Sequence, residues 1–143
     1  MGAGQEAKSY LSNPVRLDAF PGISPDHLKK LDALGISNTR QLFNAARERS
    51  ERENLSQKSG IPIEGLDELV GLADLSRAYG VGPVFARMLY DLGISSIRLL
   101  LEHSADDIVR IYEEQTLKKA DFGVNEMGFS LMLAKELEIA LEL

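Results

Sequence analysis

The chain has 143 residues, which is the length of one domain with a sizeable core. Its 44% apolar and 27% charged residues are typical of a folded globular protein. It has no cysteine, which excludes disulfides, thiolate metal sites and cysteine nucleophiles, and which favours a cytoplasmic location. No apolar run is long enough to span a bilayer, and residues 1–13, expected to be an N-terminal tail, lack the apolar core of a signal peptide.

The net charge of −6 is unevenly distributed. Residues 16–60 hold eight Lys and Arg against six Asp and Glu, whereas residues 61–143 hold seven against fifteen. A dedicated nucleic-acid binder usually carries a basic surface, and the chain as a whole does not. Solubility is the ordinary explanation of such acidity, and attraction of a basic partner is the alternative.

The first predicted module spans residues 14–46. Gly22 is placed for a tight turn, Ser24 for an N-cap, and Pro25 for the first helical position, where a missing N–H costs nothing. The helix is expected to run to Leu34 with Leu28, Leu31 and Leu34 on its apolar face, and to end at Gly35. Ser37 is expected to cap the next helix, which carries Leu42 and Phe43.

A connector at residues 47–70 leads out of this module. We predict a short helix over Glu51–Ser59, stopped by Gly60, and a longer one over Ile63–Ala78, opened by Pro62. The buried stripe of the longer helix comprises Leu66, Leu69, Val70, Ala73 and Leu75. The charged run Arg47–Glu53 is expected to be a solvated helix end, with a protein-binding surface as the alternative.

The second module, residues 71–104, repeats the first. Phe20–Leu42 and Ala78–Leu100 align without a gap at an offset of 58, with nine identities in twenty-three positions. The identities include the glycines, the proline and the serine at which helices are expected to begin and end, so a repeated unit is indicated. Gly80 marks the second turn, Gly82 the N-cap and Pro83 the helix start. The helix is expected to carry Phe85, Met88, Leu89 and Leu92 at helical spacing and to end at Gly93. The helix that follows is expected to be capped by Ser95 and to carry Leu99 and Leu100.

C-terminal helices are predicted over residues 105–143. Ser104 with Asp106 and Asp107 marks one start, for a helix carrying Ile108, Ile111 and Tyr112. Asn125 is expected to cap the last helix, whose buried residues are Met127, Leu131, Ala134, Leu137 and Leu141. Its end, Phe129–Leu143, fits either a core helix or a dimer contact. Period-two alternation is absent, so we predict an all-α, compact single domain with two pseudo-symmetric modules.

The segment Tyr79–Leu89, together with the apolar Ala78 before it, fits the pattern apolar–x–Gly–apolar–Gly–Pro–x–x–Ala–x–x–Leu and resembles the hairpin of helix–hairpin–helix proteins. The first copy departs from it at Ser24 and Leu28. From about Leu17 the chain is similar to a tandem helix–hairpin–helix family of unknown function found in prokaryotes. The residues Leu55 to Ile61 and Leu72 to Arg77 belong to that resemblance.

The resemblance implies a non-enzymatic binding module in which backbone N–H groups of the hairpins grip DNA or RNA phosphate without sequence preference. The residues implied are Gly80, Gly82, Arg77 and Arg87 in the second copy, and Gly22, Ser24, Lys29 and Lys30 in the first. Asp26, in the first turn of its helix, opposes phosphate binding, and Val84 and Phe85 supply no charge. The alternative is a scaffold or protein-interaction domain, binding another protein or itself, in which the hairpins are purely structural.

The sequence contains no recognised catalytic motif. His27 and His103 are its only histidines. A metal at His103, Asp106 and Asp107 has no recognised spacing, and helix capping is the ordinary role of those acids. Nucleophile, Walker and dinucleotide motifs are absent, so we expect no enzyme activity, no cofactor and no metal.

Overall fold

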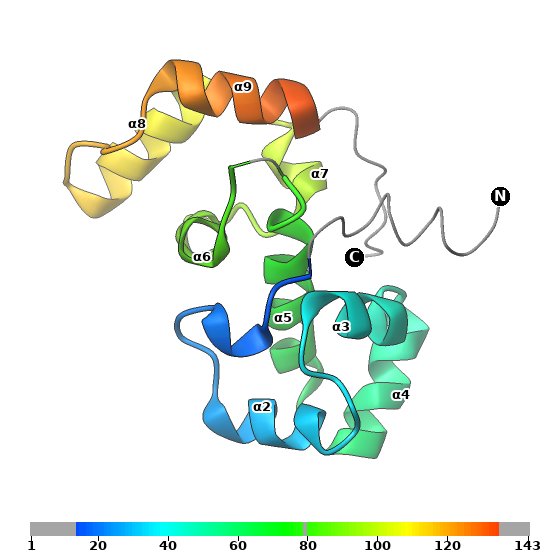
Figure 1. Ribbon diagram of the computed structural model, residues 1–143. Helices are drawn as coiled ribbons and strands as arrows, with labels where there is room; N and C mark the ends of the chain where they lie inside the picture. The colour runs from blue at the N-terminus through cyan, green and yellow to red at the C-terminus, as the bar shows by residue number, and fades with distance from the viewer. Residues whose placement is uncertain (1–13, 79, 135–143) are drawn as a thin grey trace, which may run out of the picture.

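In the computed structural model, the described residues are 14–78 and 80–134, and they form helices joined by short turns (Figure 1). Apart from a single β-bridge between Arg16 and Asn38, these residues pair into no β-structure. The predicted all-α, compact single-domain fold is confirmed. In order, the elements are η1 (a 3-10 helix, Leu17–Ala19), α2 (Pro25–Asp32), α3 (Thr39–Ala46), α4 (Arg49–Ser59), α5 (Ile63–Leu75), α6 (Pro83–Asp91), α7 (Ile97–Leu100), α8 (Ala105–Thr116) and α9 (Val124–Ala134).

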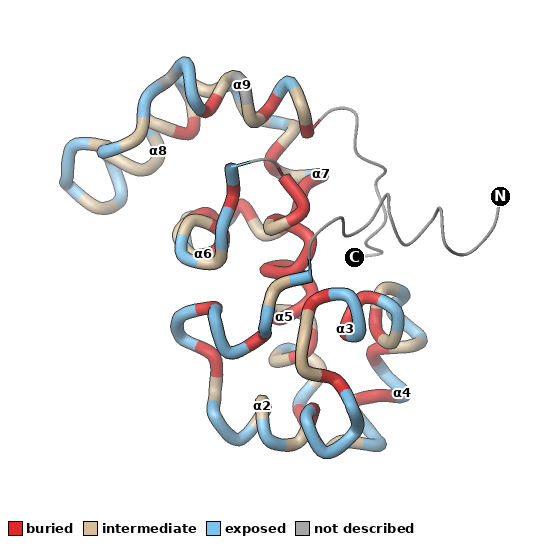
Figure 2. Tube along the Cα trace, viewed as in Figure 1, coloured by how far each residue is buried: buried red, intermediate tan, exposed pale blue. Residues whose placement is uncertain are grey.

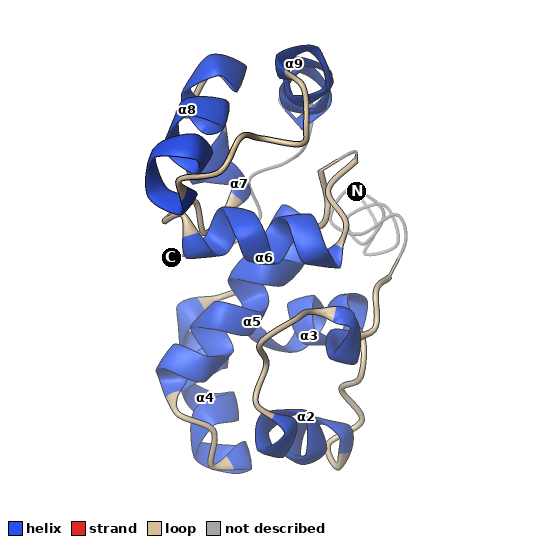
Figure 3. Cartoon of the chain, turned by 90° about the vertical axis from the view of Figure 1, so that its left-hand side faces the viewer, coloured by secondary structure: helices blue, strands red, loops and turns tan. Residues whose placement is uncertain are grey.

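Helix α5 forms the centre of the molecule (Figures 1 and 3). It contacts α3 and α4 on one side and α6 on the other. The reason is its sequence, because Leu69–Leu75 is apolar except at Asp74, and Figure 2 shows this part of the helix buried. The predicted stripe is confirmed, and it widens to include Gly71, Leu72 and Asp74. The helix ends at Leu75, three residues before the predicted end at Ala78.

Positions 58 residues apart share their local structure. Gly22 and Gly80 both have positive φ, 80° and 78°, in the left-handed region that favours glycine. Pro25 and Pro83 both begin a helix, as predicted. Both helices end in the same motif, in which Ile36 N–H donates to Leu31 C=O and Ile94 N–H to Leu89 C=O, each at 2.9 Å. They end at Asp32 and Asp91, before Leu34 and Leu92, and Leu34 is 37% exposed rather than buried.

Helix starts differ from the prediction in four places. Asn38 and Ser96, not Ser37 and Ser95, are the N-caps of α3 and α7, because the helices begin one residue later. Helix α4 starts at Arg49, where Glu48 and Glu51 form a capping box, rather than at Glu51. Helix α9 starts at Val124, so Asn125 lies inside its first turn and is not its cap.

The C-terminal pair α8 and α9 packs against α6 through aromatic residues. The Phe122 ring contacts Phe85 and Tyr112 edge to face, at 5.1 and 5.3 Å between centroids. Met127, Leu131 and Ala134 are buried as predicted, while Leu137 and Leu141 lie outside the described residues. No helix within residues 14–78 and 80–134 is both long enough and apolar enough to cross a bilayer.

Candidate phosphate-binding turns

The second turn (Gly80–Gly82) leads into α6 and is open on one side. A Cβ added at Gly82 would meet no atom within 4 Å, and the residue is exposed. At Gly80, by contrast, an added Cβ would lie 3.2 Å from Ser130 Oγ, so this glycine faces α9. Gly82 is therefore the more open of the two glycines.

The start of α6 has no side-chain cap. The Gly82 carbonyl accepts the first hydrogen bond of the helix, from the Ala86 N–H at 2.9 Å. No side chain caps the amides of the residues between Gly82 and Ala86. Pro83 has no N–H, so the uncapped donors belong to Val84 and Phe85. Val84 itself is 70% exposed, which places an apolar side chain beside these donors.

Arg77, predicted to add positive charge at this turn, lies in the interior. Its Nη1 donates to Asp74 Oδ1 at 2.6 Å, and its guanidinium stands over the Phe43 ring at 5.7 Å. Asp74 also accepts the Ile97 N–H at 2.8 Å. Burial raises the pKa of Asp74, while the Arg77 charge opposes that shift. A guanidinium in this position cannot reach a phosphate on the surface, which corrects the expectation for Arg77.

Arg87, the second expected cation, fastens the first turn onto α6. Its Nε donates to Pro21 C=O at 2.7 Å, and its Nη1 donates to Glu68 at 3.2 Å and Asp91 at 3.1 Å. The side chain is only 14% exposed. Two carboxylates therefore more than offset its charge. No local pattern in the sequence pairs Arg87 with a carbonyl sixty-six residues away, so the sequence could not reveal this role.

The first turn (Gly22–Ser24) is capped and carries mixed charge. Ser24 Oγ accepts the His27 N–H at 3.4 Å, confirming the predicted N-cap and occupying a donor that phosphate would use. Lys30 pairs with Asp26 at 2.9 Å, and its hydrogen bond holds the pKa of Asp26 below its ordinary value. Lys29 is exposed and lines a cavity of about 300 Å³ together with Arg16, Asp18 and Asp32, where cations and carboxylates balance.

One family model covers both turns. It is described as Domain of unknown function (DUF4332), and it matches residues 21–122. The chain belongs to the DUF4332 family. No curated protein and no solved structure matches the chain. Because the DUF4332 description states no activity, a function for this member has to be argued from its own residues.

In this DUF4332 member, the residues around His103 serve the start of α8. Ser104 and Asp107 form a capping box, and Asp107 also pairs with Arg110 at 3.1 Å. The Arg110 hydrogen bond, followed by that of the Ser104 backbone, lowers the pKa of Asp107. Among the residues that the structure describes, no three acidic or histidine side chains gather closely enough to hold a metal ion.

The charged run Arg47–Glu53 contains a side chain that the sequence prediction placed wrongly. Arg52 is almost completely buried, whereas the run was expected to be solvated. Its Nε lies 2.9 Å from Asp67 Oδ1, and with Arg49 it lines a cavity beside α5. Only its spacing from the apolar Leu55, three residues later on the same helix face, could have suggested an inward direction.

Proposed function

We propose that this DUF4332 chain is a non-enzymatic binding module that contacts the phosphate backbone of DNA or RNA, without sequence preference, through the start of α6. The observation that carries the proposal is the open, uncapped N-terminus at Gly82, with the amides of Val84 and Phe85 available as donors. Such a terminus combines unpaired N–H groups with the positive end of the helix dipole. The proposal treats the two turns as helix–hairpin–helix units.

The proposal gives the second turn the main role. In the first turn, Ser24 occupies an amide of α2, and Asp26 brings negative charge to its first helical turn. Contacts from Gly22, Ser24, Lys29 and Lys30 stay predictions for a weaker, secondary site. Because Arg77 and Arg87 are held by carboxylates, affinity would rest mainly on backbone donors. We therefore expect few released counterions and a slope of log K against log salt on the order of −1 to −2.

The test is fluorescence anisotropy with single-stranded, duplex and branched DNA, and with RNA, across a salt series. The expected dissociation constant is roughly micromolar to 100 µM, as for nonspecific binding. Gly82→Asp should abolish binding, because its carboxylate would cap α6 and repel phosphate. The backbone at Gly82, with φ −83° and ψ −179°, accepts any side chain, so helical content should persist.

Two variants control for side effects of that change. Gly82→Ser adds a cap without charge and should weaken binding less. Gln57→Glu adds the same single negative charge at an exposed position of α4 and should leave binding unchanged. Absence of binding at low salt by the folded wild-type chain would refute the phosphate proposal.

A protein-interaction or scaffold domain is the second candidate. It is favoured by the exposure of Val84 together with the neutralised Arg87 three residues later, since apolar surface and balanced charge suit a protein partner better than phosphate. For self-association, sedimentation equilibrium should show a dimer that Val84→Ser weakens. A monomer at all concentrations would exclude a second copy as the partner at this surface.

A further inference from the structure

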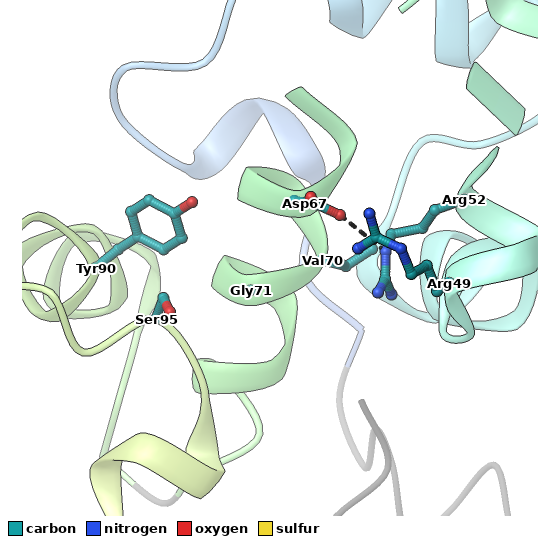
Figure 4. A pocket seen from close by; sticks show the side chains of 7 residues that line it. All are labelled: Arg49, Arg52, Asp67, Val70, Gly71, Tyr90 and Ser95. Atoms are coloured by element: carbon teal, nitrogen blue, oxygen red, sulfur yellow. Dashed lines mark ion pairs between the residues drawn. The ribbon is translucent and has the colours of Figure 1, made fainter. Parts of the chain in front are cut away.

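A cavity of about 160 Å³ lies beside α5, between α4 and the segment that contains Tyr90 and Ser95 (Figure 4). We refer to it as the α4–α6 cavity. It is separate from both turns and plays no part in the proposed phosphate contact. Its lining residues are Arg49, Arg52, Asp67, Val70, Gly71, Tyr90 and Ser95.

One cation of this cavity is fixed in place. Arg52 Nη1 donates to the carbonyls of Ala46 at 3.0 Å and Arg47 at 2.9 Å, and Nε lies 2.9 Å from Asp67 Oδ1. The side chain is 2% exposed. These contacts hold the guanidinium in one orientation, so binding there would cost little further side-chain entropy.

The second cation stands beside the first and is less constrained. Arg49 precedes Arg52 by three residues on α4, and Figure 4 shows the two guanidinium groups converging next to Asp67. Arg49 Nε lies 3.4 Å from Glu53, in a pair whose side chains are both more than half exposed. Such a pair is weak and exchanges readily with solvent.

The lining therefore has two guanidinium groups against one carboxylate, Asp67, in a chain whose net charge is −6. Glu53, which lies outside the lining, offsets the charge of Arg49 through a weak, exposed pair, and a monoanion in the cavity would take its place there. The remaining walls are the Tyr90 ring and hydroxyl, Ser95, and the apolar surface of Val70. Gly71 has no side chain, and the Ser95 carbonyl oxygen and the Tyr90 ring lie directly against its backbone. The cavity thus combines an anion-binding end with an apolar wall.

The volume limits the size of the ligand. An enclosed cavity of about 150 Å³ holds benzene, so roughly six non-hydrogen atoms of a ligand fit within the volume of the α4–α6 cavity, which is open to solvent on one side. A carboxylate with a short apolar chain has that size and that polarity, and guanidinium groups bind carboxylates with two parallel hydrogen bonds.

We propose that the α4–α6 cavity binds a small carboxylate, with its oxygens on Arg49 and Arg52 and its apolar chain against Val70 and Tyr90. Arg49 is the main contact, because Asp67 already occupies the Nε edge of Arg52. Two sources offer this chemistry, a free short-chain acid and the C-terminal carboxylate of a polypeptide that ends in a small apolar residue.

The experiment is an NMR titration of the full ¹⁵N-labelled chain with sodium propanoate at constant ionic strength. The Ser95 and Gly71 amides and the arginine Nε–H signals should shift and saturate with a dissociation constant on the order of 1–10 mM. Propanamide, which is neutral and of similar shape, should cause no saturating shift. In parallel, a tripeptide ending in alanine is compared with its amidated form, and binding by the free acid alone, the peptide alone, or both identifies the source.

Arg49→Gln should weaken binding by about 10-fold or more, since a charge-assisted hydrogen bond is lost. Arg98→Gln removes one charge from another exposed arginine and should leave binding unchanged. Circular dichroism checks that both fold, and Arg49→Lys, which keeps the charge without the planar fork, should be intermediate. No saturation by propanoate or the free-acid tripeptide up to roughly 100 mM, an equal response to propanamide, or equal losses in the Arg49 and Arg98 variants would overturn the proposal.

Discussion

At Gly71 the backbone of α5 lies against the loop that follows α6. A Cβ added there would stand 2.6 Å from the Ser95 carbonyl oxygen and 3.0 Å from Tyr90 Cε2. Glycine is thus required at this helical position by close approach of another segment, although its backbone is ordinary helix.

Gly71→Ala should therefore destabilise the fold by about 1–3 kcal/mol, because either the loop or α5 must shift. The sign of the change in the free energy of unfolding is informative, since Gly→Ala inside an unobstructed helix stabilises a protein by roughly 0.4–1 kcal/mol. The measurement is urea unfolding followed by circular dichroism. Gly128→Ala in α9, where an added Cβ would meet only the Ala105 Cβ at 4.0 Å, serves as the control, and equal losses in the two variants would contradict the steric explanation.

Among the helices, α8 has a start that responds to pH. Ser104 Oγ accepts the Asp107 N–H at 3.1 Å, and Asp107 accepts from Arg110 and from the Ser104 backbone. These bonds favour the ionised acid and lower the pKa of Asp107. A lowered acid pKa means that the contribution of this cap is present above the ordinary value of about 3.9 and is lost as pH falls through the folded-state pKa.

Arg110→Gln should raise the pKa of Asp107 toward its ordinary value, since the Arg110 hydrogen bond that most favours the ionised acid is removed. Some lowering should persist from the Ser104 backbone bond. The check is the carboxyl ¹³C titration of Asp107 by NMR, with Arg98→Gln as the charge-matched control. An unchanged Asp107 midpoint in the Arg110 variant would show that this ion pair does not form in solution.

At the scale of the whole molecule, Arg87 joins three parts of the chain. It binds the Pro21 carbonyl from the first turn, Glu68 from α5 and Asp91 from its own helix. Its guanidinium also stands 5.6 Å from the Tyr90 ring centroid. At the position 58 residues earlier, Lys29 is exposed, so equivalent positions of the two repeats have different roles.

Arg87→Met should lower stability by about 1–3 kcal/mol, because the charge-assisted bond from a largely buried side chain to the Pro21 carbonyl is lost. For a chain of this size that corresponds to a fall in melting temperature of roughly 3–10 °C. Arg87→Lys should recover only part of the loss, since one ammonium cannot reproduce the planar fork. Arg98→Met, at an exposed position, should change the melting temperature little, and a similar drop there would argue against a specific role for Arg87.

Local signals in the sequence were sufficient for much of this structure. Glycine at a left-handed turn, proline at a first helical position and an apolar stripe each act within a few residues, so the all-α fold, both turns and the buried face of α5 could be predicted. The caps of α3 and α7 were misplaced by one residue because two neighbouring residues can each cap: Ser37 and Asn38, and Ser95 and Ser96. The register follows from tertiary bonds, such as Thr39 N–H to Val15 C=O at 2.8 Å.

Only the tertiary structure decided which arginine side chains are buried and which partners they bind. Arg77, Arg87 and Arg52 are equivalent in the sequence to any surface cation, yet each is held by partners that folding supplies. For Arg87 the deciding partner is the Pro21 carbonyl, and for Arg52 it is Asp67 on another helix. A charged side chain takes whichever partner offsets the loss of its hydration on burial, and that partner is set by packing between distant segments. The sequence alone thus determined the turns, and the packing determined which cations remain available to a ligand.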